Sequence, residues 1–302
     1  MNSKNKRLLT GIALMLIAMM VVPVLDVMAK ILSRSYPVME VSWARFFFHT
    51  LWLLPILYWR NLKWWHLPKN PGLQVFRSLM LTCATVLFFT AIKSNPIPNA
   101  LTLLFISPLV VAIIAPFLLG ERFDLGMGVG VLVGFVGVIF VLQPNTEEFS
   151  PSLIFAFGAG ICYAIYIVLT RKLSLSAPPL ITLFYTAIVG TIVLTPVALT
   201  EWVMPDLISA ILMISMGFVA AVAHFLIVKA FEFASASEIS PFNYFEIIGA
   251  IIVSYVAFDF IPKPDAIIGM IVIIISGLFV SWRAIKINQN SSDKVESNIE
   301  RL

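Results

Sequence analysis

Several ionisable side chains stand inside long apolar runs, where a charge is costly unless it faces another polar group or water. Asp26 lies well inside such a run, and Lys30 follows one helical turn later on the same face. Arg45, His49 and Trp52 have the spacing i, i+4 and i+7, which places them on one stripe of a helix. An acid and a base at similar depth can bind a polar solute, carry a coupling proton or form a structural ion pair. The residues alone leave these interpretations open, while Lys30 is expected to extend outward to the membrane surface.

A second polar stripe occurs late in the chain. Ser240, Asn243, Glu246 and Ala250 follow helical spacing, and Tyr244 lies beside them. At 1.5 Å per residue, Glu246 stands roughly 12 Å inside its apolar run. An unpaired carboxylate at that depth favours the protonated form. Glu246 would therefore receive a substrate ammonium or sulfonium group, carry a proton, or remain a neutral acid hydrogen-bonded across helices.

Aromatic side chains supply the other half of this candidate cavity. Tyr163 and Tyr166 share one helix face, and a tyrosine at mid-membrane needs a partner for its hydroxyl. A cation over such a ring gains ~0.5–2 kcal/mol, and a planar base stacks on it. The chain contains 24 Phe and 7 Trp, so any single one of those rings is more often packing or lipid-facing. The candidate substrate-binding residues are Asp26, Trp43, Arg45, Phe89, Tyr163, Tyr166, Tyr185, Asn243, Tyr244 and Glu246.

The sequence lacks the residue patterns of an enzyme. It contains 3 His, none spaced as metal ligands, and no glycine-rich phosphate loop. Cys83 and Cys162 both fall inside apolar runs, so neither a disulfide framework nor a metal cluster is expected. We therefore expect no catalytic residues, no metal, no cofactor and no enzymatic activity.

The composition indicates an integral membrane protein. Of 302 residues, 60% are hydrophobic and 12% charged, and the mean hydropathy is +0.98, whereas a soluble domain has about 25% charged residues. The pI of 9.1 does not indicate a nucleic-acid partner, because the basic residues lie between apolar runs rather than on a soluble face. The expected partners are the lipid bilayer and a small-molecule substrate.

Ten apolar runs are long enough to cross the ~30 Å hydrocarbon core. No alternating pattern typical of strands occurs, so all ten are predicted to be helices, which satisfy their own backbone amides in lipid. The predicted spans cover residues 8–32, 38–59, 73–94, 98–119, 125–142, 152–172, 180–200, 205–229, 238–258 and 265–285.

The basic residues predict the orientation of these spans. If the N-terminus is cytoplasmic, the inner side receives Lys4, Lys6, Arg7, Arg60, Lys63, Lys69, Arg77, Arg122, Arg171, Lys172, Lys229, Arg283, Lys286, Lys294 and Arg301. The outer side receives only Lys30, Arg34, Lys93 and Lys263. Because positive residues accumulate on the cytoplasmic side, both termini are predicted to be cytoplasmic.

One stretch occurs twice with different residues, which indicates two copies of one unit. Residues 94–124 read SNPIPNALTLLFISPLVVAIIAPFLLGERFD, and residues 234–262 read ASASEISPFNYFEIIGAIIVSYVAFDFIP. The predicted organisation is a five-helix repeat over 8–142, a second over 152–285, and a disordered cytoplasmic tail over 286–302. Five is an odd number, so the second copy enters the membrane inverted. Inverted repeats are typical of carriers that alternate access around a site near the midplane.

These residues carry a family resemblance. The doubled unit, the segment SPLVVAIIAPFLLGERF, the glycine-rich run GMGVGVLVGFVGVIFVLQP and its counterpart GMIVIIISGLFV resemble the drug/metabolite transporter superfamily, in its branch with paired EamA domains. The resemblance covers about Leu9 to Trp282. It implies a ten-helix secondary carrier of the bacterial inner membrane.

A narrower similarity concerns the substrate. The segments LTGIALMLIAMMVVPVLDVMAKIL, EVSWARFFFHTLWLLP, LFYTAIVGTIVLTPVA and VKAFEFASASEISPFNYFEI are similar to bacterial S-adenosylmethionine uptake carriers. Uptake of S-adenosylmethionine, which joins an adenine, a sulfonium and an amino-acid group, is therefore the leading expectation. Riboflavin carriers and amino-acid exporters share the architecture and remain the alternatives, and a non-transporting membrane scaffold is the alternative of another class.

Prolines and glycines indicate where helices bend or pack. Pro108 and Pro116 interrupt the hydrogen-bond ladder of the fourth span, and Pro241 opens the corresponding ninth span. These prolines make either a hinge or a static kink. Gly126, Gly130 and Gly134 form a small-xxx-small pattern in the fifth span. That pattern favours close helix contact, either inside the chain or at a homodimer seam.

Overall fold

The computed structural model describes residues 3–62, 69–119, 125–142, 150–173, 178–233 and 240–299, and the elements in them are helical. The elements are α1 Ser3–Leu32, α2 Val38–Trp59, α3 Pro71–Ser94, α4 Ile97–Leu104, α5 Ser107–Leu119, α6 Leu125–Leu142, α7 Leu153–Lys172, α8 Pro179–Thr200, α9 Leu207–Phe233, the 3-10 helix η1 Ser240–Tyr244, α11 Phe245–Phe258 and α12 Pro264–Ile299. The predicted all-α membrane fold is confirmed.

Ten membrane passes follow from these elements. Within the described residues, eight helices are long and apolar enough to cross a membrane, counting α4 and α5 as one. The two others are α2, whose apolar run contains Glu40 and Arg45, and the shorter apolar stretch Phe242–Phe258. The ten passes agree with the ten predicted from the sequence.

Two passes are interrupted at corresponding places in the two halves. The fourth pass breaks at Phe105 and Ile106, because Pro108 has no backbone N–H to continue the helix and its ring clashes with the preceding turn. The ninth pass begins as the 3-10 helix η1, which contains Pro241, and becomes α-helical at Phe245. The flanking sequences 120–124 and 234–239 of the repeated stretch lie outside the described residues.

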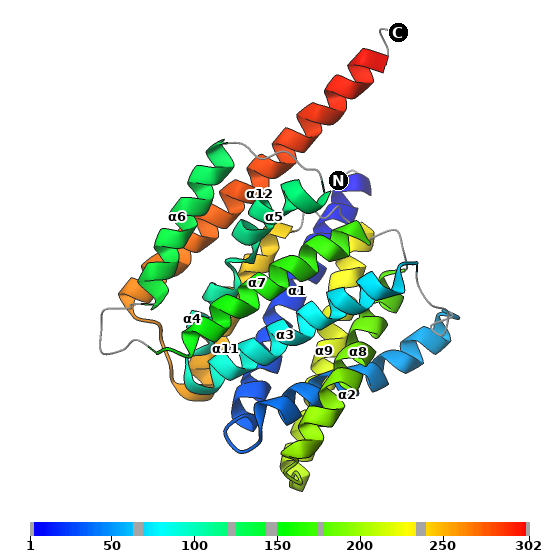
Figure 1. Ribbon diagram of the computed structural model, residues 1–302, viewed down its shortest axis with the longest axis vertical. Coiled ribbons are helices and arrows are strands. Elements are labelled where there is room, and N and C mark those ends of the chain that lie inside the picture. Colours follow the sequence, from blue (N-terminus) through cyan, green and yellow to red (C-terminus); the bar gives the residue numbers. More distant parts are fainter. Residues whose placement is uncertain are drawn as a thin grey trace.

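The packing of the helices repeats between the halves (Figure 1). Helix α1 packs against α9 as α3 packs against α7, while α2 pairs with α8, α4 with α11 and α6 with α12. Exchanging the first five passes for the last five leaves this set of pairs unchanged. Such an arrangement is expected of two copies related by a pseudo-two-fold axis, with the interface between halves running through the centre of the bundle.

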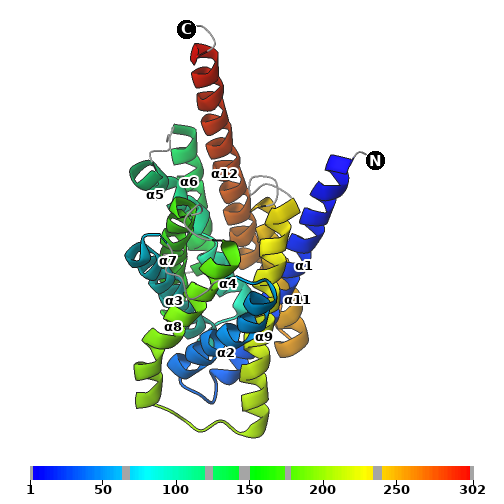
Figure 2. The same ribbon diagram turned by 90° about the vertical axis from the view of Figure 1, so that its right-hand side faces the viewer.

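Both described ends of the chain lie toward the same end of the molecule (Figures 1 and 2). Helix α12 continues to Ile299, whereas the sequence analysis expected a disordered tail from residue 286. The expectation overlooked that residues 286–299 contain no proline or glycine to end the helix. Because α12 has 36 residues, its length of about 54 Å exceeds the membrane thickness.

The glycine stripe of α6 packs inside the chain. A Cβ on Gly130 would lie 2.6 Å from Val280, and one on Gly137 would lie 3.0 Å from the carbonyl oxygen of Gly269. The hydroxyl of Ser276 donates to the carbonyl of Gly130. The stripe is therefore covered by α12, which resolves the choice between internal packing and a dimer seam for this face.

Candidate functional site: a polar cluster between the two halves

Three charged side chains from both halves meet in the middle of the bundle. Asp26 on α1 is 4% exposed and Arg45 on α2 is 9% exposed. Glu246, in the first turn of α11, is half-buried. Asp26 lies near enough to both Arg45 and Glu246 to interact with them electrostatically. The structure thus brings one residue from each of the two polar stripes, Arg45 and Glu246, close to Asp26.

The charges in this cluster are not fully paired. Nη1 of Arg45 donates to the hydroxyl of Thr85 on α3 over 2.9 Å. Oδ2 of Asp26 and Nε of Arg45 have no hydrogen-bond partner in the part of the chain that the structure describes. Asp26 and Arg45 are therefore not held as a bidentate ion pair. Buried polar atoms without partners are costly, so they mark a place where a polar ligand would be stabilised.

Two tyrosines on α7 form an aromatic wall beside these charges. The rings of Tyr163 and Tyr166 are stacked, with centroids 5.7 Å apart and planes inclined by 21°. Both tyrosines interact electrostatically with Arg45, and Tyr163 also with Glu246. Both are half-buried. Their placement agrees with the sequence-based expectation of a shared face near mid-membrane.

Arg77, counted in the sequence analysis among the charges on the predicted inner side, supports this wall from within the protein. It is fully buried. Its guanidinium donates to Thr170 of α7 over 3.3 Å and to Thr186 of α8 over 2.7 Å, and it lies 5.3 Å from the ring centroid of Tyr166. The signal in the sequence was the polar face of α3, where Gln74, Arg77, Ser78, Thr82 and Thr85 recur at helical spacing and are all buried.

Two histidines also meet in this region, one from each half. The rings of His49 on α2 and His224 on α9 are parallel within 4°, with centroids 5.2 Å apart. Both interact electrostatically with Arg45. The sequence contained both residues, but nothing in their spacing along the chain showed that they would be neighbours.

Five other candidate residues are not shown in contact with the cluster. Trp43 donates from Nε1 to Thr195 over 2.9 Å and stacks on Phe47. Phe89 is 2% exposed in the apolar core. Tyr244 belongs to the same core and lies against Phe105. Tyr185 packs beside Phe184 in a separate apolar cluster, and Asn243 is a half-buried residue of η1. The aromatic ones therefore act in packing in this conformation.

Lys30 differs from its expected outward orientation. It is 8% exposed, and its ammonium group donates to the backbone carbonyls of Ile92 and Asn95 at the end of α3. A cation at a helix C-terminus satisfies carbonyls that have no partner within the helix. Lys30 therefore joins α1 to α3 rather than reaching the membrane surface.

The halves are tied together at the end of the molecule opposite the termini. The connection between α8 and α9 is held against α2 and the connection between α1 and α2 by three contacts, which we call the strap. The backbone amide of Val203 donates to the buried carboxylate of Glu40 over 3.0 Å. The amide of Asp206 donates to the Tyr36 hydroxyl over 3.2 Å. The ring of Trp202 meets Trp43 edge-on, with centroids 5.4 Å apart.

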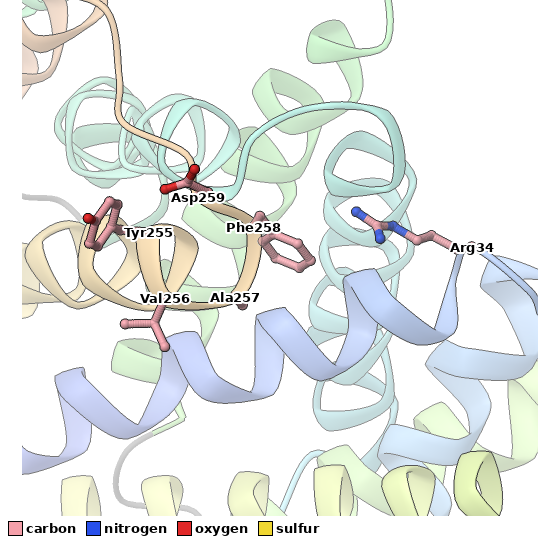
Figure 3. A pocket seen from close by; sticks show the side chains of 6 residues that line it. All are labelled: Arg34, Tyr255, Val256, Ala257, Phe258 and Asp259. Carbon is pink, nitrogen blue, oxygen red and sulfur yellow. The ribbon is translucent and has the colours of Figure 1, made fainter.

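An open pocket of about 640 Å³ lies elsewhere, at the ends of α1 and α11 (Figure 3). It is lined by Arg34 and by residues 255–259, and the Arg34 guanidinium lies 5.1 Å from the centroid of Phe258. Val256 is 80% exposed there. None of these residues belongs to the central cluster, so the pocket is distinct from the site built between the two halves.

The central cluster has the groups needed to bind a small zwitterion. Arg45 can receive a carboxylate, Asp26 and Glu246 can receive cationic groups, and the two tyrosines can stack on a planar ring. No group of three or more His, Cys, Asp or Glu residues suited to a metal occurs within the described residues. The cluster lies where the helices of the two halves meet.

Comparison with known proteins shows the family to which the whole helical bundle belongs. The model of the EamA-like transporter family matches residues 9–143 and 150–282, once for each half. The chain belongs to the EamA-like transporter family. The EamA fold accounts for the doubled unit, and membership identifies the chain as a multi-pass membrane transporter.

The chain is also similar to individual transporters. An S-adenosylmethionine uptake transporter of Rickettsia prowazekii is 30% identical over 285 residues, which cover 93% of this chain and 96% of the relative. A riboflavin transporter of Vibrio cholerae is 28% identical, over 63% of this chain and 65% of the relative. A solved crystal structure superimposes with a TM-score of 0.62 at 17% identity, covering 92% of this chain and 98% of the other, and shows the fold alone.

Proposed function

We propose that this EamA-family protein is a secondary transporter that takes up S-adenosylmethionine across the bacterial inner membrane by alternating access. The observation that supports this most directly is the cluster of Asp26, Arg45 and Glu246, with its unpaired polar atoms, between two inverted halves. Carriers of this kind bind their substrate at the interface of the repeats near the midplane. The similarity to S-adenosylmethionine uptake transporters supports the choice of substrate.

The chemistry of S-adenosylmethionine fits the cluster group by group. Its carboxylate would pair with Arg45, whose Nε has no partner among the described residues. Its ammonium and sulfonium groups would face Asp26 and Glu246, because each cation gains from a carboxylate in a site of low dielectric constant. Its adenine would stack against Tyr163 or Tyr166.

Riboflavin fits fewer of these groups. Its isoalloxazine ring can also stack on the tyrosines, and one relative is a riboflavin transporter. A flavin without a cationic group leaves Asp26 and Glu246 without a counter-charge, however. The two carboxylates therefore favour a cationic amino-acid derivative.

The test is solute exchange by the purified protein in liposomes. Vesicles loaded with unlabelled S-adenosylmethionine should accumulate labelled S-adenosylmethionine from outside, and excess riboflavin should not compete. Glu246→Gln should lower exchange at least tenfold, because loss of a charge-assisted contact costs about 1.5–3 kcal/mol. Asp259→Asn is the matched control, since Asp259 is an exposed acid in the distant pocket.

Three results would contradict the proposal. Absence of exchange by the folded native protein would exclude this substrate. Competition by riboflavin but not by methionine-containing analogues would favour the flavin. Full exchange by Glu246→Gln would remove Glu246 from the binding site.

We further propose that both termini are cytoplasmic. The excess of basic residues on the predicted inner side supports this orientation, and the two termini lie at the same end of the molecule (Figure 2). A reporter fused after Leu302 that is active only in the cytoplasm should be active. Activity of a reporter that functions only outside the inner membrane would reverse the assignment.

A further inference from the structure

The proposed mode of substrate binding does not use the pair formed by His49 and His224, and both residues are titratable. His49 is 4% exposed, and its Nε2 has no hydrogen-bond partner among the described residues. His224 is half-buried, so one side of the pair stays accessible. Histidine is the side chain that ordinarily changes charge between pH 5 and 8. A buried pair with an unused nitrogen atom is therefore equipped to accept a proton.

The pair sits at a tight contact between the two halves. A Cβ on Gly217 of α9 would lie 2.8 Å from the backbone nitrogen of His49, so the two helices touch beside the rings. Nε1 of Trp52 donates to the carbonyl of Ile214 over 3.3 Å on the same pair of helices. A charge placed on either imidazole would consequently act on the interface that must rearrange when access alternates.

The surrounding charges determine when a proton can bind. Arg45 interacts electrostatically with both imidazoles. Its guanidinium repels an imidazolium, which favours two neutral rings in the empty site. Other titratable groups on α2, α9 and the helices packed against them include Glu40 and Tyr58 of α2, Arg7, Asp26 and Lys30 of α1, Arg77, Cys83 and Lys93 of α3, Tyr185 of α8 and Lys229 of α9.

Substrate binding changes this balance. Under the function proposed above, on which this inference rests, a substrate carboxylate pairs with Arg45 and offsets its repulsion of the histidines. Substrate would then strengthen proton binding, and by linkage a proton would strengthen substrate binding to the same extent. Two ligands that favour each other's binding and cross together constitute symport.

We infer that His49 and His224 form the binding site for a proton that is co-transported with the substrate. The proton is held on an imidazole nitrogen while the loaded site changes its exposure, and it leaves with the substrate on the other side. No bond other than N–H forms or breaks. Proton transport through the pair makes the proton gradient the driving force for uptake.

The test separates exchange from accumulation in the same liposomes. With potassium and valinomycin holding the membrane potential at zero, acidifying the outside by one pH unit should raise the accumulation of labelled S-adenosylmethionine about tenfold for one proton per substrate. His49→Gln and His224→Gln should lose this gain while retaining exchange at equal pH. His66→Gln is the matched control, because His66 is the third histidine and lies outside the predicted spans.

A second measurement needs no variant. A pH-sensitive dye trapped inside should report acidification that depends on added S-adenosylmethionine. Native protein that exchanges substrate but shows neither acidification nor a response to the gradient would overturn the proton site and leave the proposed function intact. Equal gradient-driven accumulation by the native protein and both histidine variants would also overturn it. Absence of exchange altogether would refute the proposed function itself.

Discussion

Replacing Asp26 by Asn and Arg45 by Gln, singly and together, distinguishes a structural ion pair from a substrate site. In the structure the two groups attract each other, yet Oδ2 of Asp26 and Nε of Arg45 have no hydrogen-bond partner among the described residues. The guanidinium is anchored by a hydrogen bond to Thr85 on a third helix. These contacts predict that the pair contributes little to folding and much to binding.

The expected magnitudes follow from these contacts. Removing one partner of a tightly bonded buried pair costs about 3–5 kcal/mol. A hydrogen bond between membrane helices contributes about 0.6–1.7 kcal/mol, and an attraction between separated charges contributes less than the ~4 kcal/mol of charges at ~4 Å. We therefore expect a coupling free energy of about 1–2 kcal/mol between Asp26 and Arg45, smaller than for a locked ion pair.

Two assays on the same four proteins test this expectation. Titration with dodecyl sulfate measures the free energy of unfolding, and exchange of labelled S-adenosylmethionine in liposomes measures function. The double variant should recover most of the stability lost in the single variants, because no uncompensated charge remains. Its exchange should stay at least tenfold below native. A double variant that exchanges substrate normally would refute a role of Asp26 and Arg45 in substrate binding, since the two residues would then form only a structural ion pair.

Two further predictions concern packing and pH. Gly137→Leu should lower the free energy of unfolding by about 1–3 kcal/mol, because even a Cβ there meets the carbonyl oxygen of Gly269 at 3.0 Å. Gly72→Leu is the control and should leave the free energy of unfolding unchanged, because a Cβ at Gly72 meets nothing within 4 Å. Equal loss of stability in both variants would contradict the close packing of α6 against α12. Asp206 lies before α9, and the Ser209 amide that donates to its carboxylate lowers its pKa. A lowered pKa in the folded state stabilises the start of α9 above the ordinary carboxyl range and loses that effect as pH falls through the folded pKa. The protection of residues 207–210 against hydrogen exchange, taken relative to the intrinsic rate at each pH, should therefore fall in acid, and Asp206→Asn, which keeps the cap, should remove this pH dependence.

The helices were predictable because a long apolar run in lipid has few alternatives to a helix. The ten passes and the interruption near Pro108 follow directly from composition and proline position. Asp26, Arg45 and Glu246 were also identifiable, since a charge inside a span must face the protein or water. Because charged residues are rare within membrane spans, their presence there is enough to mark them as candidates for a functional site.

The side chains that contact each other across different helices were much less predictable from the sequence. Lipid is as apolar as a packed interior, so a ring such as that of Phe89 shows no polarity difference between facing the core and facing a cavity. The contact of His49 with His224 depends on how α2 crosses α9, which no spacing within one helix reports. The burial of Arg77 was not predictable, because its distance from the end of the span did not show that Thr170 and Thr186 would surround it.

The strap has a kinetic consequence for solute arriving at the end opposite the termini. Under the proposed alternating access, opening of that end would separate the Val203 amide from the Glu40 carboxylate, and this separation would not depend on the solute concentration outside. Under saturating solute, the rate of loading is then limited by thermal rupture of a few polar contacts and the parting of two indole rings. Substitutions at Tyr36, Glu40 or Trp202 would therefore change the rate of opening and, with it, the fraction of molecules ready to receive solute.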